Sequence, residues 1–424
     1  MSHSLFHENV TTCEECDHVN SIPPLKGGDR FRCQHCGHIL ISVHKHVSAR
    51  ILGVGLSSLL MLALAMSFSF LGFSSNGIDR TVSLFQTLSV LLGLGHLVLG
   101  AIISLALFVF PIVYLSSALF LVWSFQNKYV LKSAQRYCVR WIIVLQPWLM
   151  VDVFLVGILV ALVKVNSLAD ISLELSFWAF CGYVLLLLKT VTLIDKRWLW
   201  NKVAGQATEH EVEQGTAKKQ NLIGCHFCGA TLSRDAHHCD RCGHSVHSRR
   251  PNSLMTTSAL LIASLVMYIP ANVFPIMQTT FLGSTEPSTI MGGVLLLWTL
   301  ESYPVALIIL FASVVIPIAK MLALAWLCWQ CCYPSQRLTK QKIKLYKMTE
   351  LVGRWSMIDV FVVAILTSLV QMGNLVSIFP GPAVLSFTAV IVFTMLAAMS
   401  FDPRLLWDKD DGPKAASLEG EKVE

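Results

Sequence analysis

Eight of the thirteen cysteines stand in two modules, each built from two Cys-x-x-Cys pairs. A close pair places two sulfurs on one turn, so two pairs supply the four thiolates that Zn²⁺ prefers in a structural site. Gly37 and Gly243 follow the last cysteine of each module, where a turn favours a residue tolerant of positive φ. The sequence therefore predicts two zinc ribbons, each binding one zinc ion and leaving no coordination position open for catalysis. The predicted ligands are Cys13, Cys16, Cys33 and Cys36 in the first module and Cys225, Cys228, Cys239 and Cys242 in the second.

Two other chemistries are open to these thiols. Disulfides would need an oxidising compartment, whereas the modules are expected on the reducing, cytoplasmic side. A redox dithiol would need a thioredoxin-like setting, and neither module lies in a βαβ pattern. We therefore favour structural zinc and keep redox chemistry as an alternative.

Ionisable side chains also occur inside long apolar segments, where charge is costly and often functional. Lys320 lies well inside the segment 304–329, with Ser313 two turns earlier on the same helical face. Asp359 lies on a neighbouring segment at a comparable depth. Such groups could line or gate a route through the membrane, or could form a packing clamp with no part in transport. The predicted polar network consists of Ser313, Lys320, Asp359 and Thr394, and the secondary candidates are Asp152, Lys189 and Glu301.

The composition excludes an ordinary soluble protein. Hydrophobic residues make up 54% of the 424-residue chain and charged residues 14%, with a mean hydropathy of +0.62, whereas soluble domains carry about 25% charge. The net charge of +6 arises from Lys and Arg clustered beside apolar segments, which indicates membrane topology and not nucleic-acid binding. No cleavable signal peptide is expected, because the first 48 residues are polar and contain four cysteines.

Eight apolar runs are long enough to cross about 30 Å of hydrocarbon. They lie at about 50–73, 96–124, 141–164, 172–195, 254–278, 304–329, 355–373 and 378–400, and the shorter runs 83–94 and 290–299 are expected to be interfacial or re-entrant. Basic residues gather between the second and third runs and between the sixth and seventh. The positive-inside rule then predicts that both termini and the central segment are cytoplasmic.

An internal repeat relates the two halves of the chain. Residues 148–154 match residues 355–361 at an offset of 207, and Asp195 and Arg197 match Asp402 and Arg404 at the same offset. An even number of spans in each half predicts parallel repeats. The second half contains a helix-breaking stretch at 270–275 that the first half lacks, which favours the second half as the functional copy.

The expected fold is an all-α polytopic membrane protein with two parallel repeats of four transmembrane helices, each preceded by a small cytoplasmic four-cysteine zinc ribbon. The expected units are the first ribbon, the first four-helix unit, a polar linker, the second ribbon, the second four-helix unit and a disordered tail. Their boundaries are 1–48, 49–200, 201–220, 221–250, 251–407 and 408–424.

The chain resembles the paraquat-inducible protein A family of bacterial inner-membrane proteins over nearly its whole length. The motifs that carry the resemblance, besides the cysteine modules, lie at 196–200, 250–254, 268–277, 302–306, 353–361 and 401–404. The resemblance implies an inner-membrane partner of a periplasmic MCE-domain protein, and a pair that moves phospholipid between the two membranes and supports envelope integrity. The helix-one Asn/Pro pattern expected from the family is absent from 64–70.

We therefore expect a lipid transport component and not an enzyme. The chain has no Walker motif, so the energy for transport must come from another subunit or from a gradient. Two other classes remain open: a redox or stress-sensing membrane protein that uses its thiols, and a membrane scaffold whose zinc ribbons dock a cytoplasmic partner.

Overall fold

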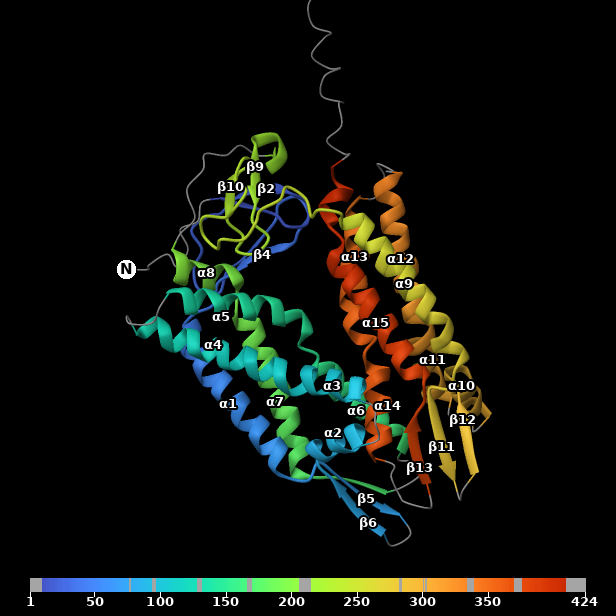
Figure 1. Ribbon diagram of the computed structural model, residues 1–424. Coiled ribbons are helices and arrows are strands. Elements are labelled where there is room, and N and C mark those ends of the chain that lie inside the picture. Colours follow the sequence, from blue (N-terminus) through green and yellow to red (C-terminus); the bar gives the residue numbers. More distant parts are fainter. Residues whose placement is uncertain are drawn as a thin grey trace, which may run out of the picture.

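The computed structural model describes residues 10–75, 78–93, 97–127, 132–165, 170–205, 215–281, 284–299, 301, 303–333, 339–369 and 376–408. The two cysteine modules lie together at one end, and two bundles of helices extend from them towards two small sheets at the other end (Figure 1). Of the expected tail 408–424, only Asp408 is among the described residues, and part of the linker 201–220 also lies outside them.

The helices and strands follow the same order in both halves. The first half contains α1 (Val47–Ser67), β5 (Leu71–Ser75), β6 (Ile78–Val82), α2 (Leu84–Gly93), α3 (Leu97–Ser104), the π-helix η1 (Leu105–Val109), α4 (Phe110–Gln126), α5 (Lys132–Leu145), the short turn η2 (Gln146–Trp148), α6 (Val151–Val165), β7 (Asp170–Leu173), α7 (Leu175–Leu193) and α8 (Lys196–Ala204). The second half contains α9 (Ser253–Val273), β11 (Met277–Phe281), β12 (Ser284–Ser288), α10 (Ile290–Thr299), α11 (Tyr303–Leu310), the π-helix η4 (Phe311–Val315), α12 (Ile316–Cys332), α13 (Thr339–Trp355), α14 (Ile358–Leu369), β13 (Val376–Pro380), α15 (Ala383–Ser400) and η5 (Pro403–Leu406).

Seven helices among the described residues are long and apolar enough to span a membrane, so the chain is a multi-pass membrane protein. Seven of the eight predicted runs correspond to these helices. The predicted run 355–373 contains α14, whose twelve described residues are fewer than a span needs. The last residues of the run, 370–373, lie outside the described residues. The third predicted span is interrupted, because α5 ends at Leu145 and α6 begins at Val151.

Each half pairs its first helix with its last long helix. The helix α1 packs along α7 in the first half, and α9 packs along α15 in the second. The halves meet where α6 packs against α14. A Cβ atom on Gly157 would lie 3.2 Å from the Cβ of Phe361, so the glycine permits this close approach. The ring of Phe154 meets the ring of Phe361 edge to face, with centroids 5.3 Å apart.

A proline at equivalent positions disturbs the long helix of each half. The π-helices η1 and η4 lie directly before Pro111 and Pro317. Proline has no backbone N–H and clashes with the preceding turn, so it disturbs the regular helical hydrogen bonding there. Ser313 lies within η4 and is buried.

The expectation of an all-α fold was wrong at the end opposite the ribbons. Three-stranded antiparallel sheets form there, in the order β6-β5-β7 in the first half and β12-β11-β13 in the second. Of these strands, β5, β7, β11 and β13 overlap the ends of runs that hydropathy assigned to helices. The pairing that completes each sheet is non-local, since β5 pairs with β7 and β11 pairs with β13 across most of each half. A window of hydropathy cannot register such pairing, so the protein is mostly helical instead of all-α.

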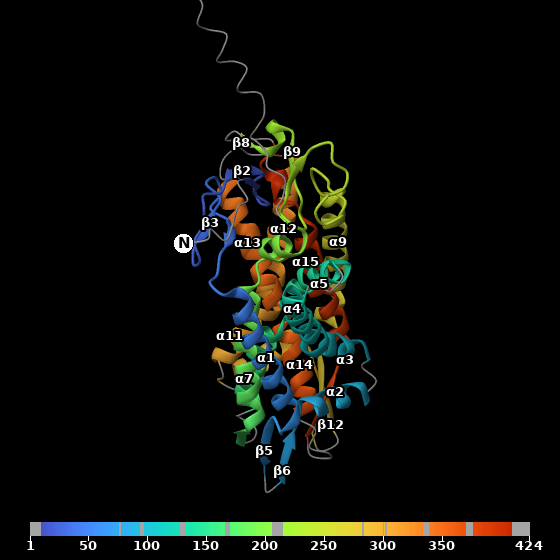
Figure 2. The same ribbon diagram turned by 90° about the vertical axis from the view of Figure 1, so that its left-hand side faces the viewer.

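Two small β-modules carry the cysteines. The first contains β1 (Val10–Thr12), β2 (His18–Ser21), β3 (Arg30–Arg32) and β4 (Ile39–Ser42), and the second contains β9 (Leu222–Gly224) and β10 (Thr231–Ser233). Strand β1 contacts both β9 and β10, so the two modules pack on each other. A further short strand, β8 (Gly215–Thr216), precedes the second module and pairs with β2 of the first. Figure 2 shows the modules at the end of the molecule opposite β5 and β6.

Candidate metal centres and buried charges

The four cysteine sulfurs of each module converge on one point. All ligand atoms within a module lie within 4.8 Å of one another. The Sγ–Sγ distances are 3.5 Å for Cys13 and Cys36 and 3.6 Å for Cys16 and Cys33. They are 3.6 Å for Cys225 and Cys242 and 3.5 Å for Cys228 and Cys239. A tetrahedral zinc with Zn–S bonds near 2.3 Å would separate its sulfurs by about 3.8 Å. The predicted grouping is confirmed, and both groups fit a tetrahedral metal ion.

Each Cys-x-x-Cys pair closes the same turn. The residue after the second cysteine has positive φ in all four turns, with values of 59° at Asp17, 73° at Gly37, 75° at Gly229 and 70° at Gly243. Its N–H donates to the carbonyl of the first cysteine, at 3.0 Å for Asp17 and 2.7–2.9 Å for the three glycines. The prediction for Gly37 and Gly243 is confirmed.

An arginine at the end of each helical unit reaches into both ribbons. Arg197 donates to the hydroxyl of Thr11 in the first ribbon and packs against Gly229 in the second, where a Cβ would lie 2.9 Å from Nε. Arg404 contacts Nε2 of His226 in the second ribbon and lies 3.8 Å from the carboxylate of Asp17 in the first. Both arginines are 2% exposed. The two ribbons are therefore held to both halves of the helical region.

The aspartates two residues earlier act differently in the two halves. Asp195 caps α8 by accepting from the N–H of Arg197, and it accepts a second hydrogen bond from the N–H of Ser42. Asp402 forms a bidentate pair with Arg404, with 3.0 Å from Nε to Oδ1 and 2.8 Å from Nη2 to Oδ2. Burial raises the pKa of Asp402, but the hydrogen bonds and the charge of Arg404 outweigh it and hold the pKa at about 2.

A second cluster of charges joins the first ribbon to the end of the chain. Arg249 donates to Asp17 at 2.9 Å and to Asp408 at 2.6 and 2.9 Å. Burial lowers the pKa of Arg249, but the two carboxylates raise it by more than burial lowers it, so the guanidinium stays charged. Sequence reasoning missed this cluster, since the pairing of residues 17, 249 and 408 depends on how the ribbons dock.

Lys320 is the buried cation among the predicted polar residues. Its side chain is 3% exposed, and its Nζ has no hydrogen-bond partner among the described residues. The hydroxyl of Thr394 donates to the carbonyl of Ile391 in its own helix at 3.0 Å. The predicted hydrogen-bonded network is therefore not formed around Lys320, because its ammonium is directed at α13. A Cβ on Gly353 would lie 2.9 Å from Nζ.

The remaining predicted residues lie at several depths. Asp359 is in the first turn of α14 and is half-buried. Asp152 occupies the equivalent position in α6 and is also half-buried. Lys189 is exposed on α7, and Glu301 is exposed between α10 and α11 with φ of 59°. The structure does not bring Lys189 or Glu301 into a cluster with Lys320.

The repeat shows how the halves differ in polarity. At the repeat offsets, Lys320 corresponds to Tyr114, Ser313 to Leu107 and Thr394 to Leu187. All three first-half residues are buried, and the hydroxyl of Tyr114 has no hydrogen-bond partner among the described residues. Asp152 is therefore the one polar position of the set that the first half retains.

Comparison with known proteins assigns the chain to a family. The model of the family described as paraquat-inducible protein A matches residues 48–204 and 254–411, two stretches spaced like the repeat. The intermembrane transport protein PqiA of Escherichia coli (strain K12) is 38% identical over 399 residues, covering 94% of this chain and 95% of the relative.

Two more distant relatives also match nearly end to end. The lipophilic envelope-spanning tunnel protein A of Escherichia coli (strain K12) is 28% identical over 95% of this chain and 92% of its own. A probable intermembrane transport protein of Haemophilus influenzae is 27% identical over 96% and 97%. No solved structure matches the chain. With the family model matching both helical units and PqiA aligning along almost the whole chain, this protein belongs to the paraquat-inducible protein A family.

Proposed function

We propose that the chain is the inner-membrane component of an intermembrane transport system that passes phospholipid to or from a periplasmic MCE-domain partner, and so supports envelope integrity. Relatives matched nearly end to end are named as intermembrane transport and envelope-spanning tunnel proteins. The observation that carries the proposal is Lys320, a buried cation inside a span of the second half. The first helix of that half, α9, contains Pro270 near its end. Groups of this kind mark transport pathways in membrane proteins more often than they serve packing.

In the proposed topology both termini and both ribbons are cytoplasmic, and the two sheets face the periplasm. Supporting this, basic residues of α5 and α13 lie toward the ribbons, as the positive-inside rule requires. The two four-helix units, 49–200 and 251–407, are parallel repeats about an axis near the membrane normal. The helices α1 and α9 both run from the ribbons toward a sheet, which supports that relation (Figure 1).

The metal sites are proposed to be structural and to hold one zinc ion each. Four thiolates leave no open coordination position, so no hydrolytic or Lewis-acid step is assigned to them. The contacts of Arg197 and Arg404 support a role in tying the ribbons to both helical units. These contacts favour the structural role over a redox or stress sensor, because a cycling Cys-x-x-Cys pair would loosen the turn that the arginines pack against. They also occupy ribbon surface that a docking scaffold would present to a partner.

The second helical unit is proposed to carry the lipid route, with Lys320 and Asp359 lining or gating it. The first unit has apolar or aromatic residues at the positions of Ser313, Lys320 and Thr394, which favours a structural role for that unit. Movement of lipid along the route would not require Lys320 and Asp359 to be hydrogen-bonded to each other in this structure.

The test is complementation of a lipid transport defect by variants that insert normally. Lys320→Ala and Asp359→Ala should abolish complementation. Tyr114→Phe, at the repeat position equivalent to Lys320, should complement fully, since its hydroxyl has no hydrogen-bond partner among the described residues. Full complementation by both alanine variants would refute the role of the second unit and favour the scaffold alternative.

A further inference from the structure

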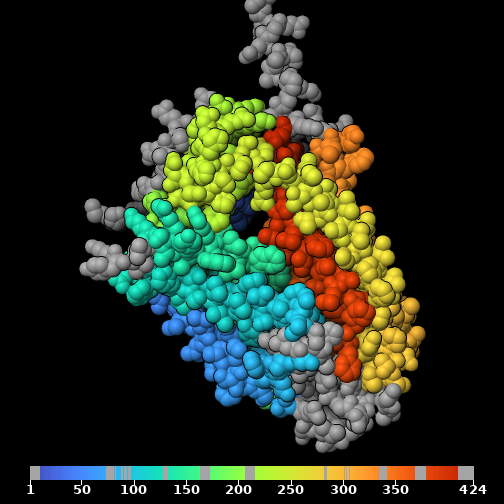
Figure 3. Space-filling model, viewed as in Figure 1, coloured from blue at the N-terminus to red at the C-terminus, as the bar shows by residue number. Residues whose placement is uncertain are grey.

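A cavity of about 380 Å³ lies between the two helical units, below the ribbons. Ile143, Gln146 and Pro147 line it from the end of α5 and the break that follows, and Gly353 and Arg354 line it from the last turn of α13, before the break to α14. These are equivalent breaks of the repeat. Figure 3 shows a hollow there, between the teal helices of the first half and the red α15. The volume is within the range of about 300–1,000 Å³ typical of small-molecule sites.

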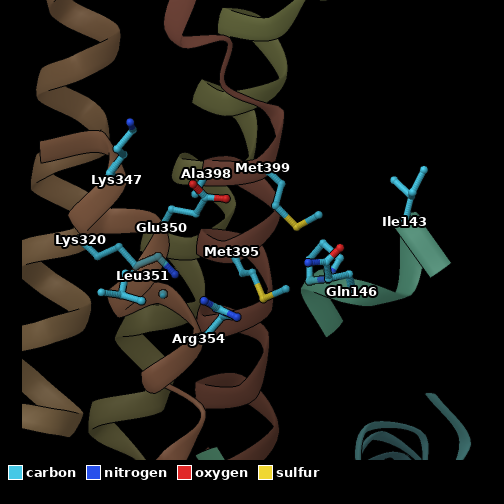
Figure 4. Close-up of a pocket in the computed structure, with 12 residues that line it drawn as sticks. Ile143, Gln146, Lys320, Lys347, Glu350, Leu351, Arg354, Met395, Ala398 and Met399 are labelled. Carbon is cyan, nitrogen blue, oxygen red and sulfur yellow. The ribbon is translucent and has the colours of Figure 1, made fainter. Parts of the chain in front are cut away.

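Two cationic side chains face this cavity. Lys320 reaches it from α12, and its ammonium is 3% exposed with no hydrogen-bond partner among the described residues. Arg354 reaches it from the end of α13, and no hydrogen bond or ion pair joins its guanidinium to another described residue. Figure 4 shows both side chains at the same pocket. The absence of a Cβ on Gly353 gives the ammonium its place, because an added Cβ would lie 2.9 Å from Nζ.

The other charged groups at the cavity are engaged or solvated. Lys347 lies 3.8 Å from the carboxylate of Glu15 and 3.2 Å from Nδ1 of His38, both in the first ribbon. Figure 4 shows it directed away from Arg354. Glu350 lines the cavity but is exposed, so water solvates its carboxylate. The interior thus has an excess of positive charge.

A buried cation without a partner is a costly arrangement, because an unpaired buried charge costs several kcal/mol. An anion bound at Lys320 would offset this cost, and a phosphate group can also accept hydrogen bonds from a guanidinium that lines the same cavity. Besides Gln146, the rest of the wall includes the apolar side chains of Met395, Leu351 and Ile143, which are suited to the glycerol and acyl carbons next to a phosphate.

We propose that this cavity binds the phosphate group of a phospholipid, held between Lys320 and Arg354 with its apolar part against α15. The inference rests on the proposed function, because it takes the transported molecule to be a phospholipid. The site would be a holding position for a lipid on the ribbon side of the helical region. Arg354 and Lys320 are its ligand-binding residues, and Gly353 is a positioning residue.

The experiment measures binding to the purified full chain in detergent. The probes are a fluorescent short-chain phosphatidylglycerol and, separately, radiolabelled inorganic phosphate. Arg354→Gln should weaken phosphatidylglycerol binding roughly tenfold to a hundredfold, the usual loss for one charge-assisted hydrogen bond. Met395→Trp keeps both cations and fills the cavity, so it should weaken binding by a similar factor. Lys344→Gln removes an exposed cation from the same helix and should bind like the unchanged protein.

Metal content and elution volume show that each variant is folded. Normal phosphatidylglycerol binding by folded Arg354→Gln and Met395→Trp would overturn the site and leave the proposed function untouched, since complementation tests that separately. Equal weakening by Lys344→Gln would also overturn it, because the binding would then be general surface electrostatics. Binding of inorganic phosphate without phosphatidylglycerol would overturn the lipid assignment. Binding of phosphatidylglycerol that excess inorganic phosphate does not displace would support it.

Discussion

Removing Asp402 should destabilise the protein far more than removing its repeat equivalent, Asp195. Asp402 is 1% exposed and makes a bidentate pair with Arg404, so Asp402→Ala leaves the buried guanidinium with only the Asp17 carboxylate, 3.8 Å away. Breaking a buried pair from one side costs about 3–5 kcal/mol. Asp195 accepts from backbone N–H groups as a helix cap, and loss of such a cap costs about 1 kcal/mol.

The pH dependence follows from the same pair. Burial raises the pKa of Asp402, but Arg404 lowers it from the ordinary 3.8 to about 2. A folded-state pKa below the unfolded value means that the contribution is fully present above about pH 4 and is lost as pH falls toward 2. That shift corresponds to about 2 kcal/mol. The unchanged protein should therefore lose stability over this range more steeply than Asp402→Ala.

The assay is denaturant unfolding of the purified protein, followed by tryptophan fluorescence and by metal release to a chromogenic chelator. Metal release reports on the ribbons, which Arg404 contacts through His226. In a double-mutant cycle, Asp402→Ala with Arg404→Ala should cost less than the sum of the single changes. Equal costs for Asp402→Ala and Asp195→Ala, or additive costs in the cycle, would refute the reasoning.

Two predictions concern the metal centres. Elemental analysis of purified protein should find about two zinc ions per chain, and chelation should release eight reactive thiols, because each site contains four cysteines. Absence of metal together with reversible oxidation of one Cys-x-x-Cys pair would favour the redox alternative. Gly229→Ala should speed metal release and unfolding more than Gly243→Ala. Both glycines have φ near 70°, but a Cβ at 229 would lie 2.9 Å from Nε of Arg197, whereas one at 243 has its nearest neighbour at 3.7 Å. Similar behaviour of the two variants would show that the Arg197 contact does not hold the ribbon.

Local spacing made the two four-cysteine clusters predictable. Four cysteines at knuckle spacing and a glycine after the last of them specify a turn within a few residues, so Gly37 and Gly243 could be placed from sequence. Asp17 was harder to predict, because non-glycine residues rarely have positive φ. Its pairing with Arg249 also joins residues that are more than 200 positions apart in the sequence. The matching Asp195-x-Arg197 and Asp402-x-Arg404 motifs signalled a shared role, but their contacts with the ribbons depend on tertiary packing.

Hydropathy located seven of the eight predicted spans as long apolar helices of the described residues, but it did not locate their ends. Hydropathy located the apolar runs but extended them into β5, β7, β11 and β13, whose pairing partners lie far away in the chain. Same-face spacing brought Ser313 and Lys320 together as candidates, yet the direction of the Lys320 ammonium depends on Gly353 in another helix. The cavity could not be foreseen, since it is formed by two helix breaks in different halves.

Transfer of a labelled phospholipid between membranes tests the central claim most directly. The measurement uses the full chain reconstituted in donor vesicles together with an MCE-domain partner, and compares the unchanged chain, Asp359→Ala and Tyr114→Phe. We expect transfer that requires the chain, is abolished by Asp359→Ala and is retained by Tyr114→Phe. Transfer at the same rate without the chain, or at the same rate with folded Asp359→Ala, would contradict it.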